Sequence, residues 1–251
     1  YRMLGTRFVM NDWKKYWRGA IMYRKFRRME RDFANRANIT YHLVGEEDAR
    51  FLRDMNPGIR PTFIRHPHYE VHDPEHEISF HKDRTRKLVA GQYNYYMQQD
   101  ADEMVAALVS ANNKKMLQEH FVITFLGRGW EQHAVTLKEA GWTVNHVTFA
   151  PDYIEEVRKH DIQITPISIG TGTKGKVLDA LANGLLVIGS WYAMENIAVV
   201  NGVSCVVYDS PTDMPGILSD IVDNREKYEE MARRGREAVL REHKRGMRLP
   251  R

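Results

Sequence analysis

The segment from Pro166 to Lys176, PISIGTGTKGK, carries residue types that are suited to binding phosphate. Its three glycines allow the backbone to turn tightly and to approach a ligand closely. A helix is predicted directly after them, and the unpaired N–H groups and the dipole at a helix start favour an anion. Lys174 and Lys176 add two full positive charges. The segment therefore predicts a phosphate site, and two lysines suit two adjacent phosphates.

Two alternatives remain open for this segment. Gly170, Gly172 and Gly175 have the GxGxxG spacing of dinucleotide-binding loops, and Glu195 lies at the distance where an acidic residue is expected. However, that loop belongs after the first strand of a Rossmann domain, whereas this one follows a later predicted strand and contains lysines. The second alternative is a glycine-rich turn needed only for packing. A P-loop is excluded because GxxxxGK[ST] is absent.

Predicted strands and helices alternate from Lys87 onward. The apolar runs predict strands at 87–91, 121–127, 143–149, 161–167, 185–189 and 203–208. Helices are predicted at 102–120, 131–140, 151–159, 175–182, 213–223 and 225–243. This alternation is typical of βαβ units, so the fold class is α/β, with a Rossmann-like parallel sheet and helices on both faces.

The N-terminal part has a different organisation. A helix is predicted at 13–33, a strand at 39–44, a helix at 46–55 and a short strand at 62–65. The polar stretch that follows is rich in His and Asp and is predicted to be a linker. We therefore expect three parts: a partial N-terminal domain at 1–66, a linker at 67–86 and a Rossmann-like domain at 87–251.

Residues 1–36 carry eleven Lys and Arg against three acidic residues, although the whole chain has a net charge of only +4. Trp13, Trp17 and Ile21 recur at four-residue spacing on the predicted helix, and Met22 and Phe26 begin an adjoining stripe. Such a helix can pack against the protein with its basic side chains solvated, lie on an anionic membrane surface, or bind nucleic acid. Nucleic acid is not predicted as a partner, because no nucleic-acid motif accompanies the charge.

The composition is that of a globular protein, with 43% hydrophobic and 28% charged residues. Cys205 is the single cysteine, so no internal disulfide can form. No apolar run reaches the length of a transmembrane helix, and charges interrupt any signal-like start. Five histidines between 66 and 81 are irregularly spaced, and no metal site is predicted there.

Three segments carry a resemblance to a known family: ITPISIGTGTKGKVLDALANGLLVIGS, AMENIAVVNGVSCVVYD and EKYEEMARRGREAVLREH. They resemble the nucleotide-sugar-binding half of GT-B fold glycosyltransferases, of the retaining group 1 type, also called family four. In that family two Rossmann-like domains enclose the active site. Residues 1–66 resemble only the last part of the acceptor-side domain, so a complete enzyme is expected to have a further N-terminal stretch. We expect this chain to be mainly the donor-binding half.

The resemblance implies roles for individual residues. Asp179 stands where the family binds the nucleotide ribose, and Thr171 replaces a glutamate that the family has eight residues earlier. The strand-end residues Thr148 and Phe149 match the place of the base, although a core position is equally open for Phe149. No catalytic residue is assigned. The remaining implied donor contacts are Gly172, Thr173, Lys174, Gly175 and Lys176 for the diphosphate, Gly170 and Thr171 for the sugar, and Gly91 and Gln92 in a second donor loop.

The implied activity is transfer of a sugar from a UDP- or GDP-linked donor to a hydroxyl of a polysaccharide, glycolipid or similar acceptor. The resemblance implies no cofactor and no metal. It also implies a cytoplasmic protein, and a peripheral position at the inner face of the membrane would let residues 1–36 contact anionic lipid. Alternatives are a non-catalytic nucleotide-sugar-binding module and, further away, a dinucleotide-binding oxidoreductase. An epimerase of the same fold is disfavoured because its His and acidic signatures are not evident.

Overall fold

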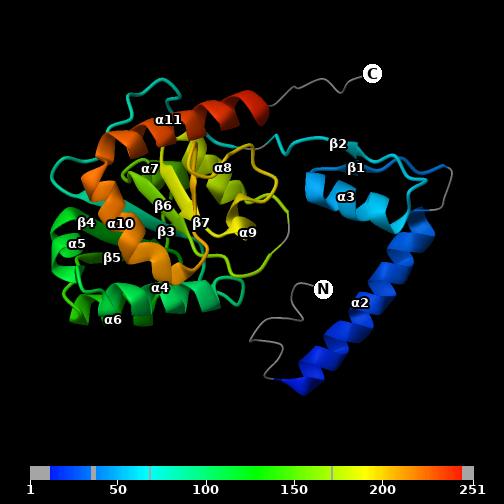
Figure 1. Cartoon of the computed structure of the whole chain (residues 1–251), viewed down its shortest axis with the longest axis horizontal. Coiled ribbons are helices and arrows are strands. Elements are labelled where there is room, and N and C mark those ends of the chain that lie inside the picture. Colours follow the sequence, from blue (N-terminus) through cyan, green and yellow to red (C-terminus); the bar gives the residue numbers. More distant parts are fainter. Residues whose placement is uncertain (1–11, 35–37, 68, 171, 245–251) are drawn as a thin grey trace.

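The computed structural model describes residues 12–34, 38–67, 69–170 and 172–244. Their centre is a six-stranded parallel sheet with helices on both faces (Figure 1), which confirms the predicted α/β class. The strands are β3 (Thr85–Ala90), β4 (Phe121–Leu126), β5 (Val144–Val147), β6 (Ile162–Thr165), β7 (Leu186–Gly189) and β8 (Val206–Val207). All six occur within the predicted runs or within two residues of them.

The strand order is β5-β4-β3-β6-β7-β8. The chain builds outward from β3 to one edge, then returns to the centre with β6 and builds to the other edge. The loops that follow β3 and β6 therefore run in opposite directions and separate at the carboxyl ends of these two strands. In open parallel sheets of this kind, ligands bind at the carboxyl ends of the strands at this switch point.

Alternate residues of each strand supply two hydrophobic cores. Val89 faces a core formed with α4 (Gln98–Ser110), α6 (Glu131–Glu139) and α10 (Met214–Asp223). Leu88 faces the opposite core, which includes α7 (Tyr153–Val157) and α8 (Gly175–Ala182). The long α11 (Arg225–Glu242) contributes Met231 to the first core and Val239 to the second. This helix thus joins the two layers.

One predicted helix is two helices in the structure. The segment expected to be helical from 102 to 120 forms α4 and then α5 (Lys114–His120). Ala111 is extended, and Asn113 precedes the first residue of α5. Asn residues favour turns because their side chains compete with helical hydrogen bonds, so the Asn112-Asn113 pair explains the break. Two elements had not been predicted, a short α9 (Trp191–Met194) and a 3-10 turn, η2 (Pro211–Asp213).

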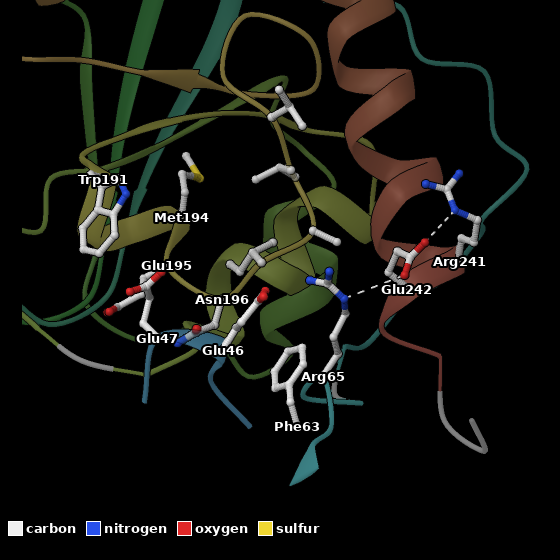
Figure 2. A pocket seen from close by; sticks show the side chains of 14 residues that line it. Glu46, Glu47, Phe63, Arg65, Trp191, Met194, Glu195, Asn196, Arg241 and Glu242 are labelled. Carbon is white, nitrogen blue, oxygen red and sulfur yellow. Dashed lines mark hydrogen bonds and ion pairs between the residues drawn. The ribbon is translucent and has the colours of Figure 1, made fainter. Parts of the chain in front are cut away.

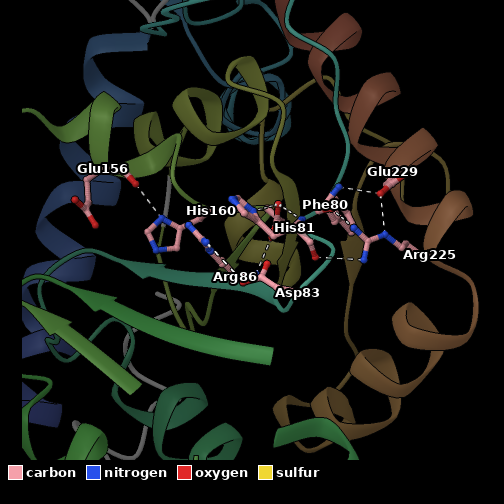
Figure 3. A network of polar contacts seen from close by, with 9 residues as sticks. Phe80, His81, Asp83, Arg86, Glu156, His160, Arg225 and Glu229 are labelled. Atoms are coloured by element: carbon pink, nitrogen blue, oxygen red, sulfur yellow. Dashed lines mark hydrogen bonds and ion pairs between the residues drawn. The ribbon is translucent and has the colours of Figure 1, made fainter. Parts of the chain in front are cut away.

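The predicted linker is fixed to the sheet domain along its second half. Ile78 and Phe80 are buried in the first core. The carboxylate of Glu229 accepts the backbone N–H of Phe80 at 2.8 Å, and Arg225 donates to the carbonyl of Phe80 (Figure 3). Asp161 accepts the N–H of His81 at 3.0 Å from the other side. The polar composition of the linker did not reveal this packing, because its partners lie on α11 and directly before β6.

The N-terminal residues form a small separate unit. β1 (His42–Leu43) and β2 (Thr62–Phe63) pair in parallel, and α3 (Glu46–Met55) packs on them through Leu52. The helix α2 (Trp13–Ala34) extends away from this unit and from the sheet domain (Figure 1). No helix in the described part of the chain is long and apolar enough to cross a membrane.

An unusual residue lies inside the first core. Lys87 of β3 is fully buried, with its Nζ 4.3 Å from the ring centre of Phe121 and 4.8 Å from that of Trp142. Within the described ranges no group accepts a hydrogen bond from this Nζ. Burial, reinforced by the charge of Arg84, holds the pKa of Lys87 well below its usual value. The fold therefore carries a desolvated amine that the two aromatic rings compensate only in part.

We predict that Lys87→Met stabilises the protein by about 1–3 kcal/mol, because a thioether fills the same space without desolvating a charge. The exposed Lys82→Met is the matched control and should change little. The pKa in the folded state lies below the unfolded value of about 10.4, so stability of the wild type should rise with pH up to that value. Chemical denaturation of the three proteins at about pH 8 and 10 measures both effects. A destabilised Lys87→Met variant, or one with the wild-type pH slope, contradicts the assignment.

Candidate functional site

The loops that follow β3 and β6 touch at the switch point of the sheet. The backbone N–H and the hydroxyl of Ser168 both donate to the carbonyl of Tyr96, at 2.8 and 3.0 Å. A Cβ added to Gly91 would lie 4.0 Å from Cδ of Lys176. The structure therefore brings Gly91 and Lys176, which sequence analysis placed in two separate donor loops, to the same place.

The glycine-rich loop leads directly into α8, which begins at Gly175 as predicted. Gly172 has a φ of 74°, a conformation that favours glycine. The side chain of Lys174 folds back over the loop, and its Nζ donates to the carbonyl of Gly172. The hydroxyl of Thr173 is buried, and the described groups around it offer it no hydrogen bond. Thr171, predicted to contact the sugar, lies outside the described residues.

Lys176 has different surroundings from Lys174. Its Nζ lies 3.8 Å from the ring centre of Tyr153, which is the first residue of α7. Although part of the side chain is exposed, partial burial lowers the pKa of Lys176, while the charge of Asp179 one turn later opposes this shift. The ammonium group therefore lies on the face of an aromatic ring while the side chain remains accessible to an arriving anion.

Asp179 is buried on α8, and the predicted linker runs past it. Its Oδ1 accepts the backbone N–H of Glu70 at 2.9 Å. One turn further, Asn183 accepts the N–H of His72 at 3.1 Å and donates to the carbonyl of Glu70 at 2.6 Å. The carboxylate predicted to bind ribose therefore also holds residues 70–72 against the helix. Sequence analysis did not foresee this second contact.

The two predicted base-binding residues lie at the end of β5. Thr148 is exposed, and Phe149 is 74% exposed, so the core position left open for Phe149 is wrong. Nearby in the chain, the Tyr153 hydroxyl is buried, and no hydrogen-bond partner for it occurs in the described segments. Burial and the charge of Asp179 raise the pKa of Tyr153. Sequence analysis did not single out Tyr153.

The loop after β3 is held in place by the loop after β4. The indole N–H of Trp130 donates to the carbonyl of Gly91 at 2.7 Å. Gly127 has a φ of 135°, and a Cβ there would lie 2.4 Å from that same carbonyl oxygen. Only glycine allows this approach, so the position of the Gly91–Gln92 loop depends on both residues.

A polar cluster supports the same loop. The carboxylate of Asp102 contacts the hydroxyl of Tyr93 at 2.9 Å and Nε2 of His133 at 2.8 Å. Burial and the Asp102 carboxylate raise the pKa of Tyr93 to about 12, so its hydroxyl remains a hydrogen-bond donor at neutral pH. The three residues come from a loop and two helices. Because they are far apart in the sequence, no spacing pattern could have identified them.

No group of three or more His, Cys, Asp or Glu side chains able to hold a metal occurs among residues 12–34, 38–67, 69–170 and 172–244. The donor-loop region is instead built from glycines, two lysines, a helix start and an exposed aromatic ring. Such a set can bind a diphosphate electrostatically and offer a planar surface to a base.

Comparisons with known proteins identify similar folds. The structure is similar to that of HepE from Anabaena in complex with UDP, with a TM-score of 0.66 and 13% identity over 87% of this chain and 63% of that chain. It is also similar to sucrose-phosphate synthase from Thermosynechococcus elongatus, with a TM-score of 0.65 and 14% identity over 87% of this chain and 57% of that one. The chain therefore spans less than two thirds of either protein.

A third similar structure is the C-terminal domain of the group 1 family glycosyl transferase LpcC from Francisella tularensis. It has a TM-score of 0.53 and 15% identity, and the match covers 64% of this chain and 87% of that domain. A comparison with curated protein sequences finds no match. The glycosyl transferase-like family model matches residues 107–249, which is more than half of the chain. The chain thus belongs to the glycosyl transferase-like family and has the GT-B fold of group 1 glycosyltransferases.

Proposed function

We propose that this chain binds the donor in a glycosyltransferase that moves a sugar from a UDP- or GDP-linked donor to an acceptor hydroxyl. The observation that carries the proposal is the contact between the loops after β3 and β6, which brings Gly91 and Lys176 together at the start of α8. HepE, which shares this fold, has been crystallised with UDP and with UDP-glucose. The resemblance to the retaining class extends the proposal to transfer with retained configuration at the anomeric carbon.

The chemistry requires stabilisation of the leaving diphosphate. When the bond between the sugar and the diphosphate breaks, negative charge develops on the diphosphate oxygens. We propose that the N–H groups of the first turn of α8 and the ammonium of Lys176 stabilise that charge with little reorganisation. Lys174 adds a second charge from within the loop. We propose that these groups act without a metal ion or cofactor.

The nucleoside would extend from the diphosphate toward β5. We propose that the exposed ring of Phe149 stacks on the base, and that Asp179 accepts hydrogen bonds from the ribose hydroxyls. Asp179 already accepts the N–H of Glu70 through Oδ1, so the ribose would share this carboxylate with the linker. The buried hydroxyl of Tyr153, whose pKa the charge of Asp179 helps to raise, would complete the ribose site.

The helix α2 supports a further part of the proposal. Its apolar residues are exposed in the described part of the chain, with Trp13 at 70% and Trp17 at 56%. At 3.6 residues per turn, the Trp13, Trp17 and Ile21 stripe lies about 160° around the helix from the Met22 and Phe26 stripe, so the two stripes do not adjoin as expected. We propose that the tryptophan stripe, flanked by basic side chains, contacts anionic lipid and that the enzyme is cytoplasmic, at the inner face of the membrane.

Calorimetric titration with UDP, GDP and NAD tests the donor proposal. UDP or GDP should bind and NAD should not. The glycine-rich loop follows β6, not the first strand of a Rossmann domain, and it contains lysines that dinucleotide-binding loops lack. Lys176→Met should weaken diphosphate binding by about 1–3 kcal/mol, since a charged hydrogen bond is lost. The control is Lys115→Met, an exposed lysine on α5, which should bind like the wild type. Binding of NAD alone, or equal binding by both variants, rules out the donor proposal.

The nucleoside contacts are tested by comparing UDP with inorganic pyrophosphate. Phe149→Ala and Asp179→Asn should each weaken UDP binding by about 1 kcal/mol and leave pyrophosphate binding unchanged. The amide oxygen of the Asp179→Asn variant can still accept the Glu70 N–H, so the linker contact is retained. Equal losses for UDP and pyrophosphate would show instead that the variants disturb the loop as a whole.

Co-sedimentation with lipid vesicles tests the role of α2. Vesicles rich in phosphatidylglycerol should bind the protein at low salt, and added salt should release it because the charge interaction is screened. Replacement of both Trp13 and Trp17 by Ala should reduce binding, whereas Phe51→Ala, an exposed aromatic on α3, should not. Equal binding to phosphatidylcholine vesicles, or none to either, excludes an electrostatic membrane contact.

A further inference from the structure

A closed ring of hydrogen bonds joins four segments at the carboxyl edge of the sheet. Its members come from the loop after β3 together with the start of α4, from the segment after β6, and from the ends of β7 and β8. These segments are far apart in the sequence, so only the fold brings them together. The ring lies directly before the glycine-rich loop, and its geometry therefore bears on the proposed donor site.

The carbonyl of Tyr96 is the point where the loop after β3 meets the segment after β6. It accepts the backbone N–H of Ser168 at 2.8 Å, the hydroxyl of the same serine at 3.0 Å and the N–H of Ile169 at 3.3 Å. Ile169 is also buried. Three donors on one carbonyl oxygen thus fix the chain directly before the glycine-rich loop begins at Gly170.

The carbonyl of Ile167 is held by the segment on the other side, after β7. Ser190 follows β7 directly, and its hydroxyl donates to this carbonyl. The preceding residue, Gly189, is bound to the end of β8, because its own carbonyl accepts the backbone N–H of Tyr208 at 3.1 Å. Since β6 lies between β3 and β7, residues 167–169 are bonded to the loops of both neighbouring strands.

A buried pair of side chains closes the ring. The hydroxyl of Tyr208 donates to Oδ2 of Asp100 at 2.7 Å, and the two residues are only 5% and 8% exposed. Asp100 lies in the first turn of α4, shortly after Tyr96, so this bond returns from the end of β8 to the loop after β3. Burial and the Asp100 carboxylate raise the pKa of Tyr208, so its hydroxyl keeps its proton and remains a donor. Removal of either partner would leave the other one buried and unsatisfied.

We propose that Tyr208 and Asp100 are positioning residues of the donor site, which act through Ser190 and residues 167–169 on the glycine-rich loop. The three glycines make this loop costly to order, because glycine loses more conformational freedom than any other residue. Fixing one end of the loop before a ligand arrives lowers that cost and so strengthens binding. The inference rests on the proposed function, because the loop is taken as the site of the diphosphate.

Ser190 is less suited to a test, because it also supports a second feature of the fold. Its hydroxyl accepts the N–H of Ala193 and so caps α9. α9 and the segment after it form one wall of a cavity of about 460 Å³. The other walls come from the start of α3, from residues near β2 and from the end of α11 (Figure 2). A Ser190 variant would disturb this wall as well as the ring, whereas Tyr208 and Asp100 do not line the cavity.

Calorimetric titration of the full chain with UDP and with pyrophosphate tests the ring, at a temperature where denaturation curves show every variant to be folded. Tyr208→Phe should weaken binding of both ligands about tenfold, because the loop must then be ordered on binding. The double variant Tyr208→Phe/Asp100→Leu removes both polar partners, so stability should recover while binding stays weak. Asp100→Asn keeps an oxygen that can accept from Tyr208 and should retain most of the affinity.

Tyr228→Phe is the matched control. Tyr228 is also 5% exposed, and its hydroxyl also donates to an aspartate, Asp220, but this bond joins α10 to α11 and involves none of the segments of the ring. The control should lose some stability and bind UDP like the wild type. Wild-type affinity in Tyr208→Phe, or a double variant that regains affinity together with stability, overturns the positioning role and leaves the donor site in place.

Amide NMR spectra of the ligand-free proteins separate this inference from the donor proposal. Tyr208→Phe should shift the resonances of residues 167–170 and 172–176, whereas Tyr228→Phe should leave them in place. Absence of these shifts in a protein whose wild type binds UDP refutes the role of the ring alone. A wild type that binds neither UDP nor pyrophosphate refutes the donor proposal, whatever the variant does to the loop.

Discussion

The parallel pairing of β3 with β6 creates the switch point of the sheet, where we propose that a charged ligand binds. The chain reverses its direction of growth between these two strands, so the loops that follow them separate and leave room at the edge of the sheet. Close backbone approach then fixes the loops. Gly127 lies against the carbonyl of Gly91, and the indole N–H of Trp130 donates to that same carbonyl. The start of α8 and Lys176 face the space that results. A shift of either strand would separate Gly91 from Lys176 and the start of α8, and the proposed site needs all three.

Sequence patterns predicted most of the sheet because its strands are continuous apolar runs bounded by glycine and helix signals. The glycine-rich segment was placed correctly between β6 and α8 for the same reason. Contacts between distant segments could not be predicted. Phe80 looked like part of a polar linker, because the Arg225 and Glu229 side chains that fix it lie far along the chain. Likewise, no local pattern links Tyr93 to Asp102 and His133.

The proposed donor loops and the segment after β7 lie at the same edge of the sheet. Ser190 joins the segments after β6 and β7 by a direct hydrogen bond to the carbonyl of Ile167. The small N-terminal unit completes the cavity through α3 and β2, while the linker that leads from it contacts Asp179 on α8. Movement of this unit would therefore change both the walls of the cavity and the contact at Asp179.

The central claim is that a nucleoside diphosphate binds at the switch point between β3 and β6. The most direct measurement is an amide NMR titration of isotope-labelled protein with UDP, which maps binding residue by residue. The account predicts the largest shifts in the segments 91–93 and 172–177, with smaller shifts near Phe149. Shifts confined to the opposite edge of the sheet, or no saturable shifts at either loop, would contradict it.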